Sequence, residues 1–202
     1  ALHFTPFARE EFQLSYEPSD DPIEQARRTV LRSFMGFGSA AASGSKTGFR
    51  ANSNRSGTTP ARDWMNFPDC IAPLMERLRG VVIENRTAAE VMLAHDGDDT
   101  LHYCDPPYVL DTRQLKNPYC KKSYRYEMTD EQHQEFAAVV RELRGAVLVS
   151  GYACPLYDEL FSGWDRVECN AHADGAQDRI EVLWMNEACA QAQTCLLYTS
   201  PS

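Results

Sequence analysis

The sequence predicts an α/β fold whose largely parallel sheet ends in an antiparallel pair of strands. From Val81 onwards, short apolar runs alternate with helical segments, as in parallel strands joined by crossover helices. Two later runs, 165–171 and 179–186, flank a turn-like stretch and predict a β-hairpin. The chain has 202 residues, 43% of them hydrophobic and 24% charged, so it can bury a core but is too short for two full-sized domains.

The N-terminal region, which we delimit as residues 1–79, reads as mainly helical. Thr5 and Pro6 predict the cap and the first turn of an opening helix. Asp21, followed by a first-turn proline and a capping-box glutamate, predicts a second helix over 22–34.

A long stretch rich in Gly, Ser, Asn and Thr follows, from residue 36 to residue 60. Loops of this length inside a compact domain are usually functional or disordered. A helix is expected to resume near Pro60, and another to cover 68–79 with Gly80 as its stop.

Three apolar runs predict buried parallel strands at 81–84, 101–104 and 146–150. The segments between them predict helices over 88–94 and 129–144, the second of which opens on a capping box and ends before a glycine. Strands and helices in this order are the basis of the α/β assignment.

Positive charge is concentrated in two segments, although the net charge of the whole chain is −9. Twelve of the 20 basic residues lie in 27–62 and 113–125, and neither segment contains an acidic residue. This segregation suits a protein that holds a phosphate backbone on one face; two solvated loops are the alternative. The candidate DNA-binding residues are Lys46, Arg50, Asn52, Asn54, Arg55, Arg62 and Arg113.

The tetrapeptide Asp105-Pro106-Pro107-Tyr108 directly follows the predicted strand 101–104. Ligands of open α/β sheets bind beyond the carboxyl ends of the strands. The prolines fix the backbone and leave carbonyl groups free to accept, while the aspartate adds an acceptor and the tyrosine a stacking face. Together they suit a planar ring with an exocyclic amino group, such as an adenine turned out of a helix; a rigid turn is the plain alternative.

The tetrapeptide is similar to the [Asp/Asn/Ser]-Pro-Pro-[Tyr/Phe/Trp] signature of S-adenosyl-L-methionine-dependent amino-methyltransferases. With stretches such as RSFMGFGSAAASGSKTGFRANSNRSGTTPARDW, VVIENRTAAEVM and DTLHYCDPPYVLDTR, the chain resembles phage and prophage DNA adenine methylases over residues 2–190. The resemblance implies a Rossmann-like methyltransferase fold. Residues 80–190 would be the C-terminal part of the catalytic domain, and 1–79 a target-recognition region.

The resemblance also implies the reaction and its site. A methyl group would pass from S-adenosylmethionine to the N6 amino group of a flipped-out adenine in double-stranded DNA, at a specific site. The implied catalytic residues are Asp105, Pro106, Pro107 and Tyr108, and the implied cofactor-binding residues are Asp105 and Tyr103. A restriction endonuclease is the partner that a restriction-modification system would add.

Residues 34–38, FMGFG, match the Phe-x-Gly-x-Gly pattern of the cofactor loop in these enzymes, but they follow a polar helix rather than a buried strand. We interpret them as a helix end that leads into the DNA-binding loop. The true cofactor loop and the first strands of the sheet are then expected upstream of Ala1, and the fragment alone is expected to be inactive. Residues 195–202 are interpreted as a non-native tail.

The remaining candidates are assigned structural roles. The seven cysteines lack zinc spacing and predict buried, reduced thiols in the cytoplasm of a bacterium or phage-infected host, and neither a metal site nor a membrane span is expected. We expect His102 to be packed, His133 to be solvated and Cys104 not to act as a nucleophile. Two alternative functions stay open: an RNA adenine or protein glutamine methyltransferase, and a catalytically silent DNA-binding remnant.

Overall fold

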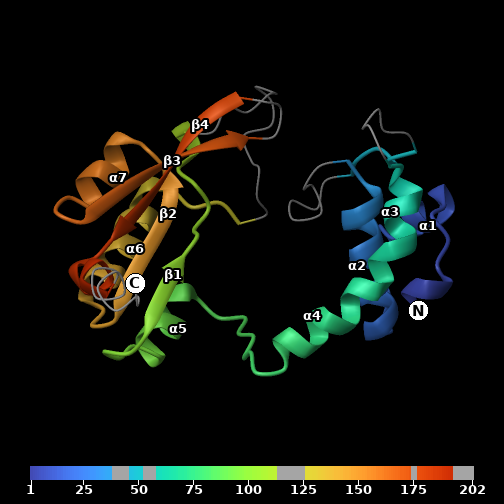
Figure 1. Ribbon diagram of the computed structural model, residues 1–202, viewed down its shortest axis with the longest axis horizontal. Helices are drawn as coiled ribbons and strands as arrows, with labels where there is room; N and C mark the ends of the chain where they lie inside the picture. Colours follow the sequence, from blue (N-terminus) through green and yellow to red (C-terminus); the bar gives the residue numbers. More distant parts are fainter. Residues whose placement is uncertain (38–45, 52–57, 113–125, 174–176, 193–202) are drawn as a thin grey trace, which may run out of the picture. The chain divides into compact units, whose positions relative to one another are not determined.

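The computed structural model consists of two compact units (Figure 1). The first, a helical unit, covers Ala1–Ile83, and the second, an α/β unit, begins at Glu84. The structure describes residues 1–37, 46–51, 58–112, 126–173 and 177–192.

The helical unit encloses a core of aromatic and long aliphatic side chains. Phe12, Leu31, Met35 and Trp64 are buried together, and the indole N–H of Trp64 donates to the carbonyl of Thr5 at 2.8 Å. Its elements are η1 (Leu2–Phe4), α1 (Arg9–Leu14), α2 (Pro22–Met35), α3 (Pro60–Asn66), η2 (Phe67–Cys70) and α4 (Ile71–Leu78).

Capping explains where these helices begin. The Asp21 side chain accepts from the amide of Ile23 at 2.9 Å, so α2 begins as the sequence predicts. The predicted opening cap at Thr5 is wrong, because the buried hydroxyl of Thr5 donates back to the carbonyl of Ala1 at 3.1 Å. The first α-helix therefore starts later, at Arg9.

The α/β unit contains a four-stranded mixed sheet in the order β1-β2-β4-β3. The pair β1–β2 is parallel, and β2–β4 and β4–β3 are antiparallel, so the predicted hairpin at the end of the sheet is confirmed. The strands are β1 (Leu101–Cys104), β2 (Ala146–Tyr152), β3 (Asp165–Ala173) and β4 (Gln177–Met185).

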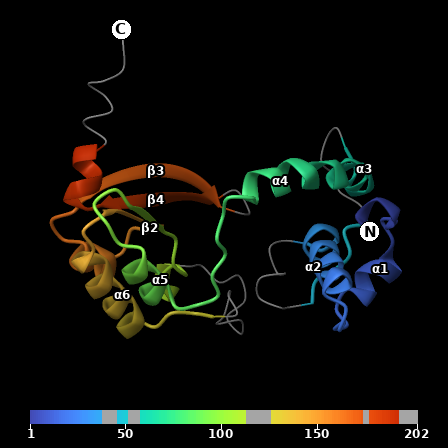
Figure 2. The ribbon, with the colours of Figure 1, turned by 90° about the horizontal axis from the view of Figure 1, so that it is seen from below.

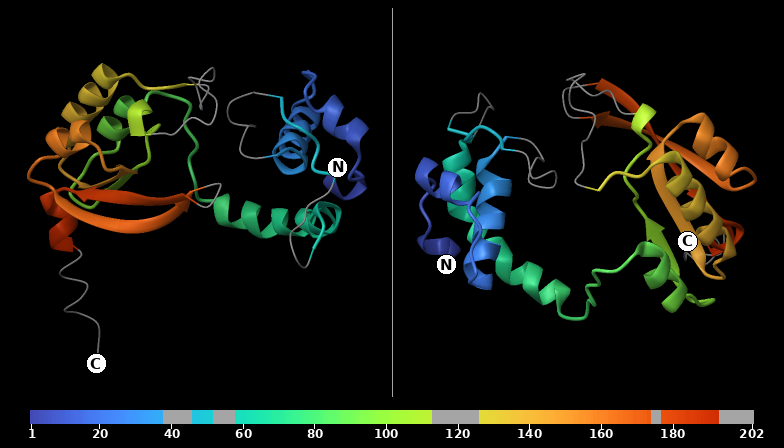
Figure 3. Two further views of the ribbon diagram at one scale, coloured as in Figure 1. Left: turned by 90° about the horizontal axis from the view of Figure 1, so that it is seen from above. Right: turned by 180° about the vertical axis from the view of Figure 1, so that it is seen from behind.

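Three helices of the α/β unit pack on one face of the sheet. They are α5 (Ala88–Ala94), α6 (Asp130–Glu142) and α7 (Pro155–Leu160), and a short turn, η3 (Leu110–Thr112), follows β1. Figures 2 and 3 show α5 and α6 on the same side of the strands. The buried cluster joins Val149 of β2 and Trp184 of β4 to Met92, Val140 and Tyr157 of the three helices.

The opposite face of the sheet carries exposed apolar side chains. Leu101 and Tyr103 of β1 are each 63% exposed, and Val167 of β3 is 45% exposed. Alternation along the strands explains this difference, because His102 and Cys104 of the same strand point to the covered face.

The predicted strand over 81–84 is not formed. These residues lack regular secondary structure, and Val82 and Ile83 are about four-fifths exposed. A strand exists only where a neighbour satisfies its backbone groups, and within the described residues β1 is the edge of the sheet and pairs with β2 alone. Apolar composition was therefore not enough to make this run a strand.

His133 is fully buried, so its predicted solvation is wrong. It lies four and seven residues before Ala137 and Val140, on the buried stripe of α6. Its Nδ1 is 2.9 Å from the Tyr157 hydroxyl of α7, a helix that the sequence analysis did not predict. His102 is packed as expected, at 8% exposure.

The cysteines only partly match the expectation. The five that the structure describes are free thiols, but Cys70 and Cys169 are exposed rather than buried. Among the described helices, none combines the length and apolarity needed to cross a membrane. The described residues also hold no cluster of three or more His, Cys, Asp or Glu side chains that could bind a metal ion.

Candidate active site

The parallel pairing of β1 and β2 brings two polar side chains together at the carboxyl edge of the sheet. Cys104 lies opposite Val149, so the next residues along, Asp105 and Ser150, are neighbours. The buried Ser150 hydroxyl is 2.9 Å from Oδ1 of Asp105 and 3.3 Å from the Cys104 carbonyl oxygen. This hydroxyl holds the Asp105 carboxylate in place while the rest of the side chain stays exposed.

Tyr108 ends the motif with a ring that is itself packed. Its ring meets that of Tyr152 edge to face, with centroids 4.6 Å apart at an interplanar angle of 79°. Burial, and then the negative charges of Asp105 and Glu181, raise the pKa of Tyr108 to about 12. The phenol therefore stays neutral at physiological pH and presents an uncharged aromatic face.

Cys104 is next to the motif, but its thiol is not activated for reaction. Burial raises the pKa of its thiol to about 11, and its Sγ lies 3.7 Å from the sulfur of Met92. A protonated thiol is a poor nucleophile. The chemistry of this edge therefore rests on the carboxylate and the ring.

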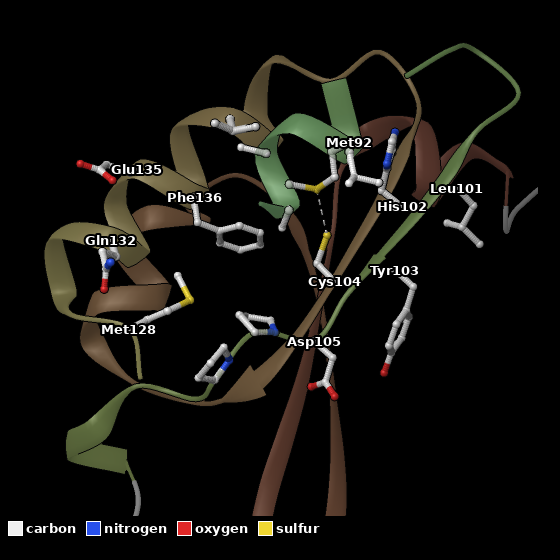
Figure 4. A pocket seen from close by; sticks show the side chains of 16 residues that line it. Met92, Leu101, His102, Tyr103, Cys104, Asp105, Met128, Gln132, Glu135 and Phe136 are labelled. Carbon is white, nitrogen blue, oxygen red and sulfur yellow. Dashed lines mark hydrogen bonds between the residues drawn. The ribbon is translucent and has the colours of Figure 1, made fainter. Parts of the chain in front are cut away.

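An open cavity of about 830 Å³ lies beside the motif, between α5, α6 and β1 (Figure 4). Its walls are mainly apolar, with Met92 of α5 and Phe136 of α6, and α6 adds the polar Gln132 and Glu135. In Figure 4 the Cys104 side chain is directed towards Met92, and Tyr103 lies on the other side of β1. Asp105, Pro106 and Pro107 also line the cavity, and Tyr103 borders it although its side chain lies on the other side of β1.

Three of the candidate DNA-binding residues are described, all in the helical unit. Lys46 is exposed, with its Nζ 5.6 Å from the centroid of the Tyr16 ring. Arg50 donates from Nη1 to the carbonyl of Phe34 at 3.3 Å, at the end of α2. Arg62 is exposed in the first turn of α3. The candidates that lie outside the described residues are Asn52, Asn54, Arg55 and Arg113.

The glycine pattern at 34–38 has a packing explanation. Phe34 and Met35 belong to the last turn of α2, so the pattern begins within this helix and its first glycine follows the helix end. A Cβ atom on Gly36 would lie 2.5 Å from Oγ1 of Thr47 and 2.8 Å from the carbonyl of Arg32. Close approach of the returning chain thus accounts for the glycine at 36; residue 38 lies outside the described part.

Sequence reasoning missed Ser150 and Tyr152 as parts of this site. Both lie on β2, and each contacts a residue of the Asp105–Tyr108 motif. The available signal was the parallel alignment of the predicted strands 101–104 and 146–150, which would have placed residue 150 beside Asp105.

A mixed α/β sheet with an Asp-Pro-Pro-Tyr motif at its carboxyl edge is consistent with a methyltransferase fold. Residues 50–174, more than half of the chain, match the D12 class N6 adenine-specific DNA methyltransferase family. The chain therefore belongs to this family, which implies methylation of adenine in DNA. A search of curated proteins found no match.

Proposed function

We propose that this protein is a site-specific DNA methyltransferase that transfers a methyl group from S-adenosylmethionine to N6 of a flipped-out adenine. One observation carries the proposal beyond family membership. The Asp105 carboxylate is fixed by Ser150 directly at the carboxyl end of β1, with the two prolines and a neutral aromatic ring following it.

Each part of the motif has a role in this proposal. Asp105 and the carbonyl of Pro106 accept the two hydrogens of the exocyclic amino group, and Tyr108 stacks on the base. The amino nitrogen is a weak nucleophile because its lone pair is delocalised into the ring. Holding both hydrogens in acceptors favours the pyramidal nitrogen and orients its lone pair.

The residues beside the motif fit a cofactor that carries both a positive charge and a flat aromatic ring system. The Asp105 side chain is exposed and pairs with no cation among the described residues, so its carboxylate can pair with a positively charged group of the cofactor. The cavity offers apolar walls next to it. S-adenosylmethionine supplies an electrophilic methyl group when bound, and we assign its binding to Asp105 and Tyr103.

We assign target recognition to residues 1–79 and the chemistry to 80–190. Exposed Lys46 and Arg62 in the first region support the recognition of double-stranded DNA. A DNA substrate of this kind fits a protein that acts in the cytoplasm of a bacterium or a phage-infected host. A restriction endonuclease is the partner to look for there.

Transfer of a labelled methyl group tests this function. An active preparation should label unmethylated duplex DNA at adenine N6, and it should label neither RNA nor a glutamine-containing protein. Labelling of RNA or of protein glutamine would favour the alternative methyltransferases. Duplex binding without any retention of S-adenosylmethionine in equilibrium dialysis would instead identify a DNA-binding remnant.

A further inference from the structure

Three cations of the helical unit lie on aromatic rings, in a part of the molecule that is separate from the Asp105–Tyr108 motif. The Arg32 guanidinium carbon is 5.7 Å from the centroid of Tyr16, and Nζ of Lys46 is 5.6 Å from the same centroid. The Arg9 guanidinium carbon lies 4.9 Å from the centroid of Phe49. Ring contacts of this kind orient a cation without neutralising it.

Two other arginines of α2 form ion pairs with glutamates. Arg27 pairs with Glu11 and Glu24, and Arg28 pairs with Glu24, each at 2.7 Å. These cations are neutralised within the unit, and their contacts join α1 to α2.

The ring-bound cations have no such partners. None of them forms an ion pair with another residue in the part of the chain that the structure describes. Arg9 and Lys46 are exposed, so their charge is available to an anion from outside. The cations concerned are Arg9, Arg32 and Lys46.

The rings of Tyr16 and Phe49 form an aromatic platform under these cations, and contacts with the main chain and the core hold it in place. The Thr47 amide donates to the Tyr16 hydroxyl at 3.0 Å, and the Phe37 amide donates to the Gly48 carbonyl at 3.2 Å. The Phe49 ring packs on Phe12, with centroids 5.7 Å apart. The chain around Lys46 is therefore held in place before any ligand arrives.

A cavity of about 360 Å³ lies at this platform. Arg9 and Lys46 both line it, together with Gln13 and Tyr16. Glu17 lines it too. Two cations and one carboxylate therefore line the cavity, and Arg32, which lies on the Tyr16 ring, adds a third cation next to that ring.

We propose that Arg9 and Lys46, supported by Arg32 and the rings of Tyr16 and Phe49, form a binding site for the phosphodiester backbone of DNA. The inference rests on the proposed function and names a site for its substrate. Guanidinium and ammonium groups donate charge-assisted hydrogen bonds to phosphate oxygens. Such contacts set the position of the protein on the duplex and carry no base information.

The test compares two variants of the full chain. In Arg9→Gln/Lys46→Gln both exposed cations are removed, and Arg77→Gln removes an exposed cation of α4 that lies outside the platform. Binding of a short fluorescent duplex is measured by anisotropy over a series of KCl concentrations, and circular dichroism checks the helix content.

The double variant should bind the duplex at least about tenfold more weakly at low salt. The negative slope of log affinity against log salt should become shallower by about 1.8, which is about 0.9 for each lost phosphate contact. Arg77→Gln should leave the slope unchanged. If the double variant loses helix content, the single change Lys46→Gln at an exposed position is measured instead. It should still make the negative slope shallower by about 0.9.

The outcomes separate this site from the proposed function. Wild-type protein that binds the duplex in a salt-dependent way, with a double variant of unchanged slope, would overturn the phosphate site and leave the methyltransferase proposal standing. Wild-type protein that binds no duplex would overturn both.

Discussion

In the helical unit, Phe12, Leu31 and Trp64 from three helices bury one another, and three cations lie on aromatic rings of the same unit. In the α/β unit, the helices cover one face of the sheet, and Leu101 and Tyr103 stay exposed on the other. The first arrangement places cations on a closed core, and the second places a carboxylate and a ring at a sheet edge. These arrangements correspond to the two roles that we propose, in which the helical unit holds the DNA and the α/β unit holds the target base.

The largest expected effect tests this division at the motif. In a complete, active enzyme, Asp105→Ala should abolish methyl transfer, because the carboxylate both orients the amino nitrogen and contributes to the cofactor site, together on the order of several kcal/mol. Duplex affinity, measured by anisotropy, should not change. Near-normal methyl transfer would contradict the catalytic role of Asp105. An equal loss of methyl transfer and duplex binding would contradict the separation of the two roles between the units.

Loss of a core tryptophan tests whether the two units are stabilised separately. Trp64 and Trp184 are 4% and 1% exposed, one in each buried cluster, and Trp→Ala at either should cost about 3–5 kcal/mol. Hydrogen exchange read by mass spectrometry should lose protection only in the unit that carries the change. Loss of protection throughout the chain would show that the two cores unfold together.

A smaller effect is expected at the stacking ring. Tyr108→Ala should weaken capture of the target base by about 1–3 kcal/mol, because stacking is lost. Tyr108→Phe keeps the ring face and should be mild. Steady-state kinetics of methyl transfer on duplex DNA would measure both, and a Phe variant as impaired as the Ala variant would shift the role from the ring to the hydroxyl.

Each unit also contains one carboxylate with a strongly lowered pKa. Contacts with Arg27 and Arg28 lower the pKa of Glu24 from 4.5 to about 2, and backbone hydrogen bonds from Arg144 and the following residue, with His102, lower that of Asp96 from 3.8 to about 2.

Because both pKa values are lower in the folded state, the stabilisation is present above the unfolded values and is lost as pH falls from about 4 to about 2. Glu24→Gln should flatten this acid dependence in the helical unit, and Asp96→Asn should flatten it in the α/β unit. Circular dichroism melts between neutral pH and pH 2 would measure these small effects. An unchanged pH dependence in either variant would show that the replaced carboxylate does not contribute to the acid dependence of stability.

The parts of the fold that were predictable have local signals. The helix over 88–94 and the strand over 101–104 match the structure residue for residue, and α6 opens on the Thr129–Gln132 capping box that the sequence shows. The motif was likewise visible as a contiguous run at a strand end.

The parts that were missed depend on distant neighbours. Residues 81–84 have the composition of a strand but no partner among the described residues. His133 is buried because α7 returns to α6, and Ser150 reaches Asp105 only through the register of two strands. Pairing and register are set by tertiary contacts, which a propensity pattern does not contain.

The contact between Phe37 and Gly48 has a consequence for how this protein can diversify. It brings the two ends of the intervening segment, 38–47, side by side at the end of α2. The entropy of closing a loop on fixed ends grows only logarithmically with its length, by about 0.6 kcal/mol for each doubling. Changes in chain length between these ends therefore cost the helical core little, as long as Lys46 and Thr47 keep their contacts with Tyr16.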